Sequence, residues 1–183
     1  MRKTTALVAT LMVLMTLSAC SGDEVDPTVV ESEYELDGRL FKIESDLFWV
    51  KSGQAGEEDQ IRLIQETSGD GDRDMIVLIP VLGNGKLEGS YIYSKTGDIR
   101  TYDIVYVKNI KNQNSYDWIT NGESGSALQI VRAGSRNGEP VYTFRIDEFD
   151  LDYGFYDFLA DTWVSKGIKK FRFQYQGGID DQR

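Results

Sequence analysis

The chain has 183 residues, with 30 Asp or Glu side chains against 20 Lys or Arg, and its formal net charge at pH 7 is −10. Such a negative surface repels phosphate backbones and anionic lipid headgroups, so nucleic acid is not an expected partner. The sequence contains no histidine and one cysteine, Cys20. These counts exclude an intrachain disulfide, a Ser-His-Asp or Cys-His catalytic centre and a histidine-ligated zinc site.

Residues 1–19 have the layout of a cleaved export signal. Arg2 and Lys3 precede an apolar run over 6–17, which is too short to span a bilayer, and small residues lead up to Cys20. The Leu-Ser-Ala-Cys sequence that ends at Cys20 resembles the lipobox of bacterial lipoproteins. This resemblance implies cleavage before Cys20 and a lipid on its thiol. Acyl chains are then expected to hold the protein in a cell envelope, with the outer membrane favoured and the periplasmic or surface orientation left open.

The segment 20–33 is predicted to be a lipidated cysteine followed by a flexible acidic tether. It has many acidic residues and no hydrophobic period. Acidic residues just after the lipidated cysteine resemble the surface-export signals of Bacteroidetes lipoproteins, and a plain charged spacer is the alternative. Cleavage leaves 164 residues with 18 basic and 30 acidic side chains, a net charge of −12.

Residues 34–178 are predicted to form a single β domain, and 179–183 a tail. Short β-prone runs alternate there with turn residues, among which Asp37-Gly38 has the positive-φ preference of a type I′ hairpin. The segment 108–125, rich in Asn, Ser and Gly, is expected to be a long loop. Expected strands cover 34–36, 39–43, 47–50, 60–65, 75–82, 86–94, 99–107, 127–133, 141–149 and 168–175.

One helix is predicted over 155–166. Phe155, Phe158, Leu159 and Trp163 recur at i, i+3, i+4 and i+8, which is the spacing of one helical face. The expected fold class is therefore mainly β: a single antiparallel β-barrel, lipocalin-like, or a β-sandwich, with one short C-terminal helix. Consecutive hairpins favour the barrel.

Three short fragments carry a further resemblance to a protein family. They are Leu-Asp-Gly at 36–38, Gly-Lys-Leu-Glu-Gly-Ser-Tyr at 85–91 and Tyr-Gln-Gly-Gly at 175–178. These fragments are similar to small Bacteroidetes lipoproteins with calycin-like domains. The resemblance implies a lipocalin-like barrel.

Asp70, Asp72 and Asp74 have the alternate spacing of a calcium-binding loop, since calcium prefers hard oxygen ligands. An EF-hand needs Gly at the sixth position and a carboxylate at the twelfth, where this chain has Met75 and Val81. Turn statistics favour the alternative, a solvated hairpin turn in which Asp side chains cap the backbone. No cofactor other than calcium at this loop is expected.

Four aromatic residues are candidates for ligand binding. Trp118 lies beside Tyr116 in the predicted polar loop, and Tyr153 and Tyr156 follow a second acidic stretch. Exposed aromatic faces stack on sugar rings, although β domains also build their cores from such residues.

The expected function is a non-catalytic, lipid-anchored binding module for a glycan or a small apolar ligand. The alternative is a structural or interaction subunit of an envelope complex, whose acidic surface meets a basic partner protein. A carboxylate-based hydrolase is a third hypothesis. An open pocket lined by aromatic side chains would favour the first, a filled interior with an exposed patch the second, and two carboxylates facing each other in a cleft the third.

Overall fold

The computed structural model describes residues 28–50, 59–66, 73–83, 85–111 and 115–181. The predicted export signal and Cys20 lie outside these ranges. The described residues form strands, turns and loops, and they contain no helix. Accordingly, no described segment is a helix of the length and apolarity needed to cross a membrane.

Within the described ranges, twelve strands form one mixed sheet. Their bounds are β1 Glu33–Leu36, β2 Arg39–Lys42, β3 Leu47–Val50, β4 Gln60–Glu66, β5 Arg73–Pro80, β6 Gly89–Tyr93, β7 Thr101–Lys111, β8 Ser115–Gly125, β9 Leu128–Arg136, β10 Glu139–Asp157, β11 Thr162–Gly177 and β12 Ile179–Asp181.

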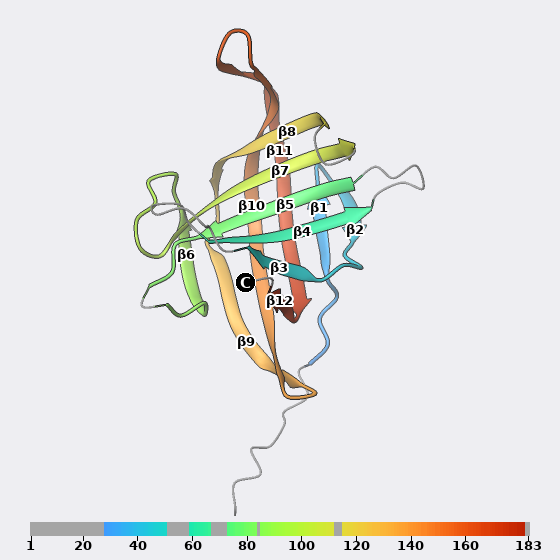
Figure 1. Ribbon diagram of the computed structural model, residues 1–183, viewed down its shortest axis with the longest axis vertical. Coiled ribbons are helices and arrows are strands. Elements are labelled where there is room, and N and C mark those ends of the chain that lie inside the picture. The colour runs from blue at the N-terminus through green and yellow to red at the C-terminus, as the bar shows by residue number, and fades with distance from the viewer. Residues whose placement is uncertain (1–27, 51–58, 67–72, 84, 112–114, 182–183) are drawn as a thin grey trace, which may run out of the picture.

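The strand order is β12-β3-β4-β5-β7-β6-β9-β10-β11-β1-β2, and β8 pairs with both β7 and β10. Figure 1 shows β4, β5, β7 and β8 running across the molecule, whereas β10 and β11 run along its long axis. Most neighbours are antiparallel, as predicted. The prediction is wrong for two pairs, β6 with β7 and β12 with β3, which are parallel.

In two hairpins the turn residues adopt the positive φ angles that their residue types favour. Asp37 and Gly38 join β1 to β2 with φ of 54° and 81°, and Asn137 and Gly138 join β9 to β10 with φ of 53° and 82°. A type I′ turn needs positive φ at both central residues, and Asn, Asp and Gly tolerate it best. The turn predicted at Asp37-Gly38 is confirmed.

The core lies between strands that cross one another. The ring centroid of Tyr34 in β1 lies 6.1 Å from that of Tyr106 in β7 and 6.3 Å from that of Phe171 in β11. Inward Phe171, Phe173 and Tyr175 alternate with polar residues along β11. The largest side chains that are completely buried are aromatic: Tyr34, Tyr91, Tyr102, Tyr106, Phe144, Phe149, Phe171 and Phe173.

The predicted helix over 155–166 is wrong. β10 continues to Asp157, and after a turn β11 begins at Thr162. Phe158 and Leu159 are 82% and 102% exposed, so the apolar face that should stabilise a helix has nothing to pack against. Asp157 Oδ1 instead accepts the backbone N–H groups of Leu159 and Ala160 at 2.9 and 3.1 Å, which closes the turn.

The predicted long loop over 108–125 is also wrong. β7 extends to Lys111, and Ser115–Gly125 forms β8 between β7 and β10. Ladders on both sides satisfy the backbone of this polar segment, so tertiary pairing overrides its low β propensity. In the predicted tail, Ile179–Asp181 forms β12 and pairs with β3.

Candidate binding surface

The core contains buried tyrosines whose hydroxyl groups have partners, whereas the Tyr93 hydroxyl beside this core has none among the described residues. Tyr102 donates to the carbonyl oxygen of Ser126 at 2.7 Å, and Tyr175 donates to that of Gly178 at 2.8 Å. Both side chains are at most 3% exposed. These residues therefore serve the core, and they do not form an open pocket lined by aromatic side chains.

Asp74 is one of the most buried polar residues described. It is 2% exposed, and its Oδ2 accepts hydrogen bonds from the hydroxyl groups of Tyr34 at 3.0 Å and Tyr106 at 2.5 Å. Burial first, and then the Asp74 charge, raises the pKa of Tyr34 well above its ordinary value. Burial likewise raises the pKa of Tyr106, with smaller contributions from Tyr34 and Asp74. Both phenols therefore stay protonated and act as donors.

This arrangement bears on the predicted calcium loop. Asp74 lies in β5 and faces the core, while Asp70 and Asp72 lie outside the described residues. Within the ranges that the structure describes, no group of three or more acidic or cysteine side chains is placed to hold a metal ion.

A shallow depression of about 140 Å³ crosses the outer face of β1, β10 and β11. Register explains its polar character, because Glu33 and Glu35 of β1 lie opposite Gln174 and Arg172 of β11. Side chains alternate across a strand, so these point outward while Tyr34 and Phe173 between them point into the core. Its lining residues are Glu33, Glu35, Arg145, Ile146, Asp147, Arg172, Phe173 and Gln174.

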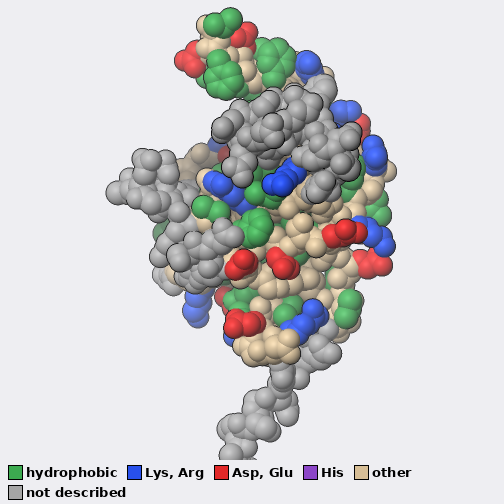
Figure 2. All heavy atoms as spheres, turned by 45° about the vertical axis from the view of Figure 1, so that its right-hand side comes forward, with side chains coloured by type: hydrophobic (Ala, Val, Ile, Leu, Met, Phe, Trp, Pro, Cys, Tyr) green, Lys and Arg blue, Asp and Glu red, His purple; other side chains and the backbone are tan. Residues whose placement is uncertain are grey.

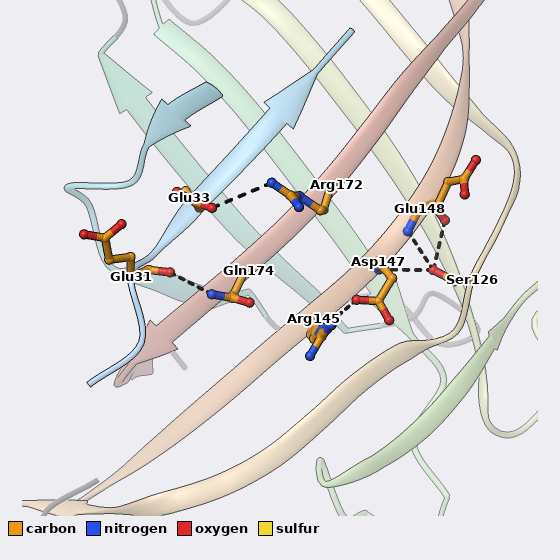
Figure 3. Close-up of polar contacts among 8 residues, drawn as sticks. All are labelled: Glu31, Glu33, Ser126, Arg145, Asp147, Glu148, Arg172 and Gln174. Atoms are coloured by element: carbon orange, nitrogen blue, oxygen red, sulfur yellow. Dashed lines mark hydrogen bonds and ion pairs between the residues drawn. The ribbon is translucent and has the colours of Figure 1, made fainter. Parts of the chain in front are cut away.

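A bulge in β10 shapes one side of the depression. The register of β10 against β11 shifts between Ile146 and Phe149, and Asp147 and Glu148 lie in this gap, both exposed. Their N–H groups donate to the Ser126 hydroxyl oxygen at 3.1 and 3.0 Å, as Figure 3 shows. Ser126 therefore replaces the missing ladder partners and holds both carboxylates on the outer surface.

The charged side chains around the depression form exposed pairs. Arg172 Nη2 lies 2.9 Å from Glu35 Oε2 and 3.9 Å from Glu33 Oε1, and Arg145 Nε lies 2.5 Å from Asp147 Oδ1. The two arginine side chains are 50% and 58% exposed. Exposed pairs contribute only about 0–1 kcal/mol each, so a ligand can displace them easily.

Lys170 extends this array along β11. Its Nζ lies 2.9 Å from Glu148 Oε1 and 2.7 Å from Asp150 Oδ1. We call the whole array the outer polar strip. Its members are charged residues, acidic and basic, that point outward: Glu33, Glu35, Arg145, Asp147, Glu148, Asp150, Lys170 and Arg172. The strip offers guanidinium donors and carboxylate acceptors side by side, which suits a polar partner that presents both.

The predicted aromatic residues are not members of this strip. Tyr116 and Trp118 belong to β8, and their side chains are outside the described part of the structure. Tyr153 is half-buried in β10, with Lys169 Nζ 5.9 Å from its ring centroid. Tyr156 is 37% exposed and donates to Asp161 Oδ1 at 2.6 Å. Neither Tyr153 nor Tyr156 lines the depression.

Comparisons with models of protein families, with curated proteins and with solved structures find no match for this chain. The assignment of a function therefore rests on the residues themselves.

Proposed function

We propose that this protein is a lipid-anchored envelope protein that acts without catalysis, as an interaction subunit that binds a partner protein on its outer surface. The observation that carries the proposal is the filled interior. The large aromatic side chains that a ligand-binding barrel would leave around a cavity are packed against one another and are almost fully buried. A contact surface is therefore favoured over an enclosed ligand, and the outer polar strip is the best candidate for it.

The finer description of the fold belongs to the same proposal. We infer a lipocalin-like barrel, because strands at opposite ends of the strand order share one core and β8 joins β7 directly to β10. Such a barrel would keep the side chains of one sheet face inside and would present the strip on the other.

Charge suggests the kind of partner. The lipidated chain would carry a net charge of −12, which accelerates association with a basic surface and slows association with an acidic one. Within the strip, Glu33, Glu35 and Glu148 would accept hydrogen bonds from lysine and arginine side chains of the partner. Arg145 and Arg172 would give the contact its orientation, because a planar guanidinium favours defined geometry.

The anchor and the strip are tested separately. Labelled palmitate should enter the wild-type protein and should be lost in Cys20→Ala, which should also leave the membrane fraction. For the strip, cells are cross-linked and the adducts of Glu33→Lys/Glu35→Lys are compared with those of Glu123→Lys, an exposed residue of β8 outside the strip. The strip variant should lose a protein adduct that the control retains.

A different result would favour the other hypotheses. If the purified protein bound a fluorescent apolar probe at one site per chain, or bound sugars on a glycan array, the ligand-binding hypothesis would replace this one. Equal adducts in both charge variants would remove the strip from the interface.

A further inference from the structure

The hairpin between β10 and β11 extends beyond the rest of the sheet. The pairing of β10 with β8 ends at Gly154 opposite Ile119, whereas the pairing of β10 with β11 continues to Asp157 opposite Thr162. Figure 1 shows this end of the hairpin standing beyond β8. Within the described residues, the last residues of the hairpin are therefore paired only with each other.

The end of the hairpin exposes apolar side chains between two acidic residues, Asp157 and Asp161. Phe158 and Leu159 are 82% and 102% exposed, and Phe155 and Tyr156 are 40% and 37% exposed. We call these four residues the hairpin tip. Figure 2 shows hydrophobic side chains gathered at this end of the molecule, beyond its main body.

The carboxylates beside the hairpin tip accept hydrogen bonds from groups in the same turn. Asp157 accepts the N–H groups of Leu159 and Ala160, and Asp161 accepts the hydroxyl of Tyr156. These bonds lower the cost of bringing the two carboxylates into a less polar medium, since a satisfied polar group loses less on leaving water. The end of the hairpin then presents mainly its apolar side chains.

Groups of different polarity follow a definite order along the hairpin. Phe158 and Leu159 are at the end. Asp157 opposite Thr162 comes next, with its carboxylate bonded to N–H groups of the turn, and Tyr156 opposite Trp163 follows. Lys166 follows, with its Nζ 5.1 Å from the ring centroid of Phe155. Apart from Asp157, whose carboxylate is bonded within the turn, the order runs from apolar residues through amphipathic aromatic residues to lysine. This is the order found from the hydrocarbon edge of a bilayer to its headgroups.

The spacing of these groups also matches a bilayer interface. Phe155, which marks the level of the Lys166 ammonium, lies two residues from Asp157, or about 7 Å at the rise of a β-strand. The headgroup region on one side of a bilayer is about 5–7 Å thick. An ammonium at the phosphates therefore places the turn at the hydrocarbon edge.

We propose that the hairpin tip inserts into the interface of a lipid bilayer, with Phe158 and Leu159 at the hydrocarbon edge and Lys166 at the phosphates. A protein partner is less favoured because the tip exposes only about 500 Å² of side chain, against about 800 Å² per partner in a stable protein interface. The same limit applies to a second copy of the chain. Because the net charge of the chain is −10, a zwitterionic surface should be preferred to an anionic one.

This contact is separate from the proposed anchor. In Figure 1 the described chain begins, in blue, at the end of the long axis opposite the hairpin. An anchor at Cys20 and the hairpin tip therefore make two different contacts. For this reason the test uses the chain from residue 20 onward carrying Cys20→Ala, which has neither the apolar run over 6–17 nor an acyl chain.

The test compares binding to phosphatidylcholine–phosphatidylethanolamine vesicles by flotation. Phe158→Ser/Leu159→Ser removes both exposed side chains at the tip. The matched control is Ile92→Ser/Ile99→Ser, since these residues are 70% and 71% exposed elsewhere on the surface. Losing two apolar side chains should weaken vesicle binding by about tenfold or more, while the control should stay within about twofold of the parent chain.

A fluorescent probe then reports where the chain enters the lipid. An environment-sensitive dye at Leu159→Cys should shift to the blue and be quenched by brominated lipid, whereas the dye at Val29→Cys, a residue 79% exposed, should not respond.

Phosphatidylglycerol should weaken binding at low salt, and added salt should restore it. Equal flotation of the tip and control variants would overturn the proposal. So would a dye at 159 that stays in water, or a dimer in solution that the tip variant abolishes.

Discussion

Replacing Phe149 with alanine should destabilise the protein far more than the same replacement of Phe158. Phe149 lies in the middle of β10, and Phe158 lies in the turn that joins β10 to β11. Phe149 is 0% exposed, and its ring centroid lies 4.8 Å from that of Tyr93 and 6.0 Å from that of Tyr102. Removing a buried phenylalanine costs about 3–5 kcal/mol in transfer free energy and cavity formation. Total stability is about 5–15 kcal/mol, so this is a large share of it.

Phe158 is the matched control. It is 82% exposed, so its replacement by alanine should change the free energy of unfolding by about 0.5 kcal/mol or less. Urea denaturation followed by circular dichroism gives both values. Calorimetry should show the melting temperature of Phe149→Ala lower by roughly 6–20 °C, at about 2–4 °C per kcal/mol for a chain of this size. Equal losses in the two variants would refute the reasoning, because they would mean that residue 158 also packs against the body.

Three further predictions concern the core and the base of the hairpin. Tyr106→Phe removes one of the hydroxyl donors to the buried Asp74 carboxylate and should lower the free energy of unfolding by about 2 kcal/mol in urea titrations. Burial raises the pKa of Tyr175 to about 12, so the folded state keeps a proton that the unfolded chain releases near its ordinary value of 10.0. Stability should therefore be complete below pH 10 and fall as the pH rises toward 12, measured by urea unfolding and phenolate absorbance at each pH. Gly154→Ala places a Cβ against the carbonyl oxygen of Val164 and should cost about 1–3 kcal/mol, measured by thermal unfolding.

Each of these predictions has an outcome that contradicts it. An unchanged midpoint for Tyr106→Phe would mean that the phenol bond adds nothing to the buried carboxylate. Constant stability between pH 10 and 12 would mean that the core tyrosines titrate normally. Gly178→Ala is the control for Gly154→Ala, because no atom lies within 4 Å of its added Cβ, and equal effects would place no close contact at Gly154.

The hairpins were predictable from sequence because each is determined by its turn residues and by the strands directly beside them. Asp37-Gly38 and Asn137-Gly138 adopt the positive φ that these residue types favour, and the strands beside them alternate in polarity. The segment 155–166 could not be predicted in the same way. Its apolar residues have helical spacing, but they are exposed, and periodicity predicts a helix only when the apolar face has a core to cover.

The candidate site was accessible to sequence analysis only in part. The outward alternation of Lys170, Arg172 and Gln174 is visible in the sequence, but the outer polar strip exists because β1 and β10 lie on either side of β11. Asp74 was misassigned for a related reason. Its neighbours predict a solvated turn, whereas the hydroxyl groups of Tyr34 and Tyr106, which are distant in sequence, donate to its buried carboxylate.

The pairing of β1 with β11 has a consequence for the order of events during synthesis. Glu33 lies opposite Gln174 and Leu36 opposite Phe171. β1 therefore cannot pair with β11 until β11 has left the ribosome. Contacts of such large sequence separation slow the search for the native state. A nascent chain of this protein therefore remains incomplete, and open to chaperones or a translocation channel, until its final residues have been translated.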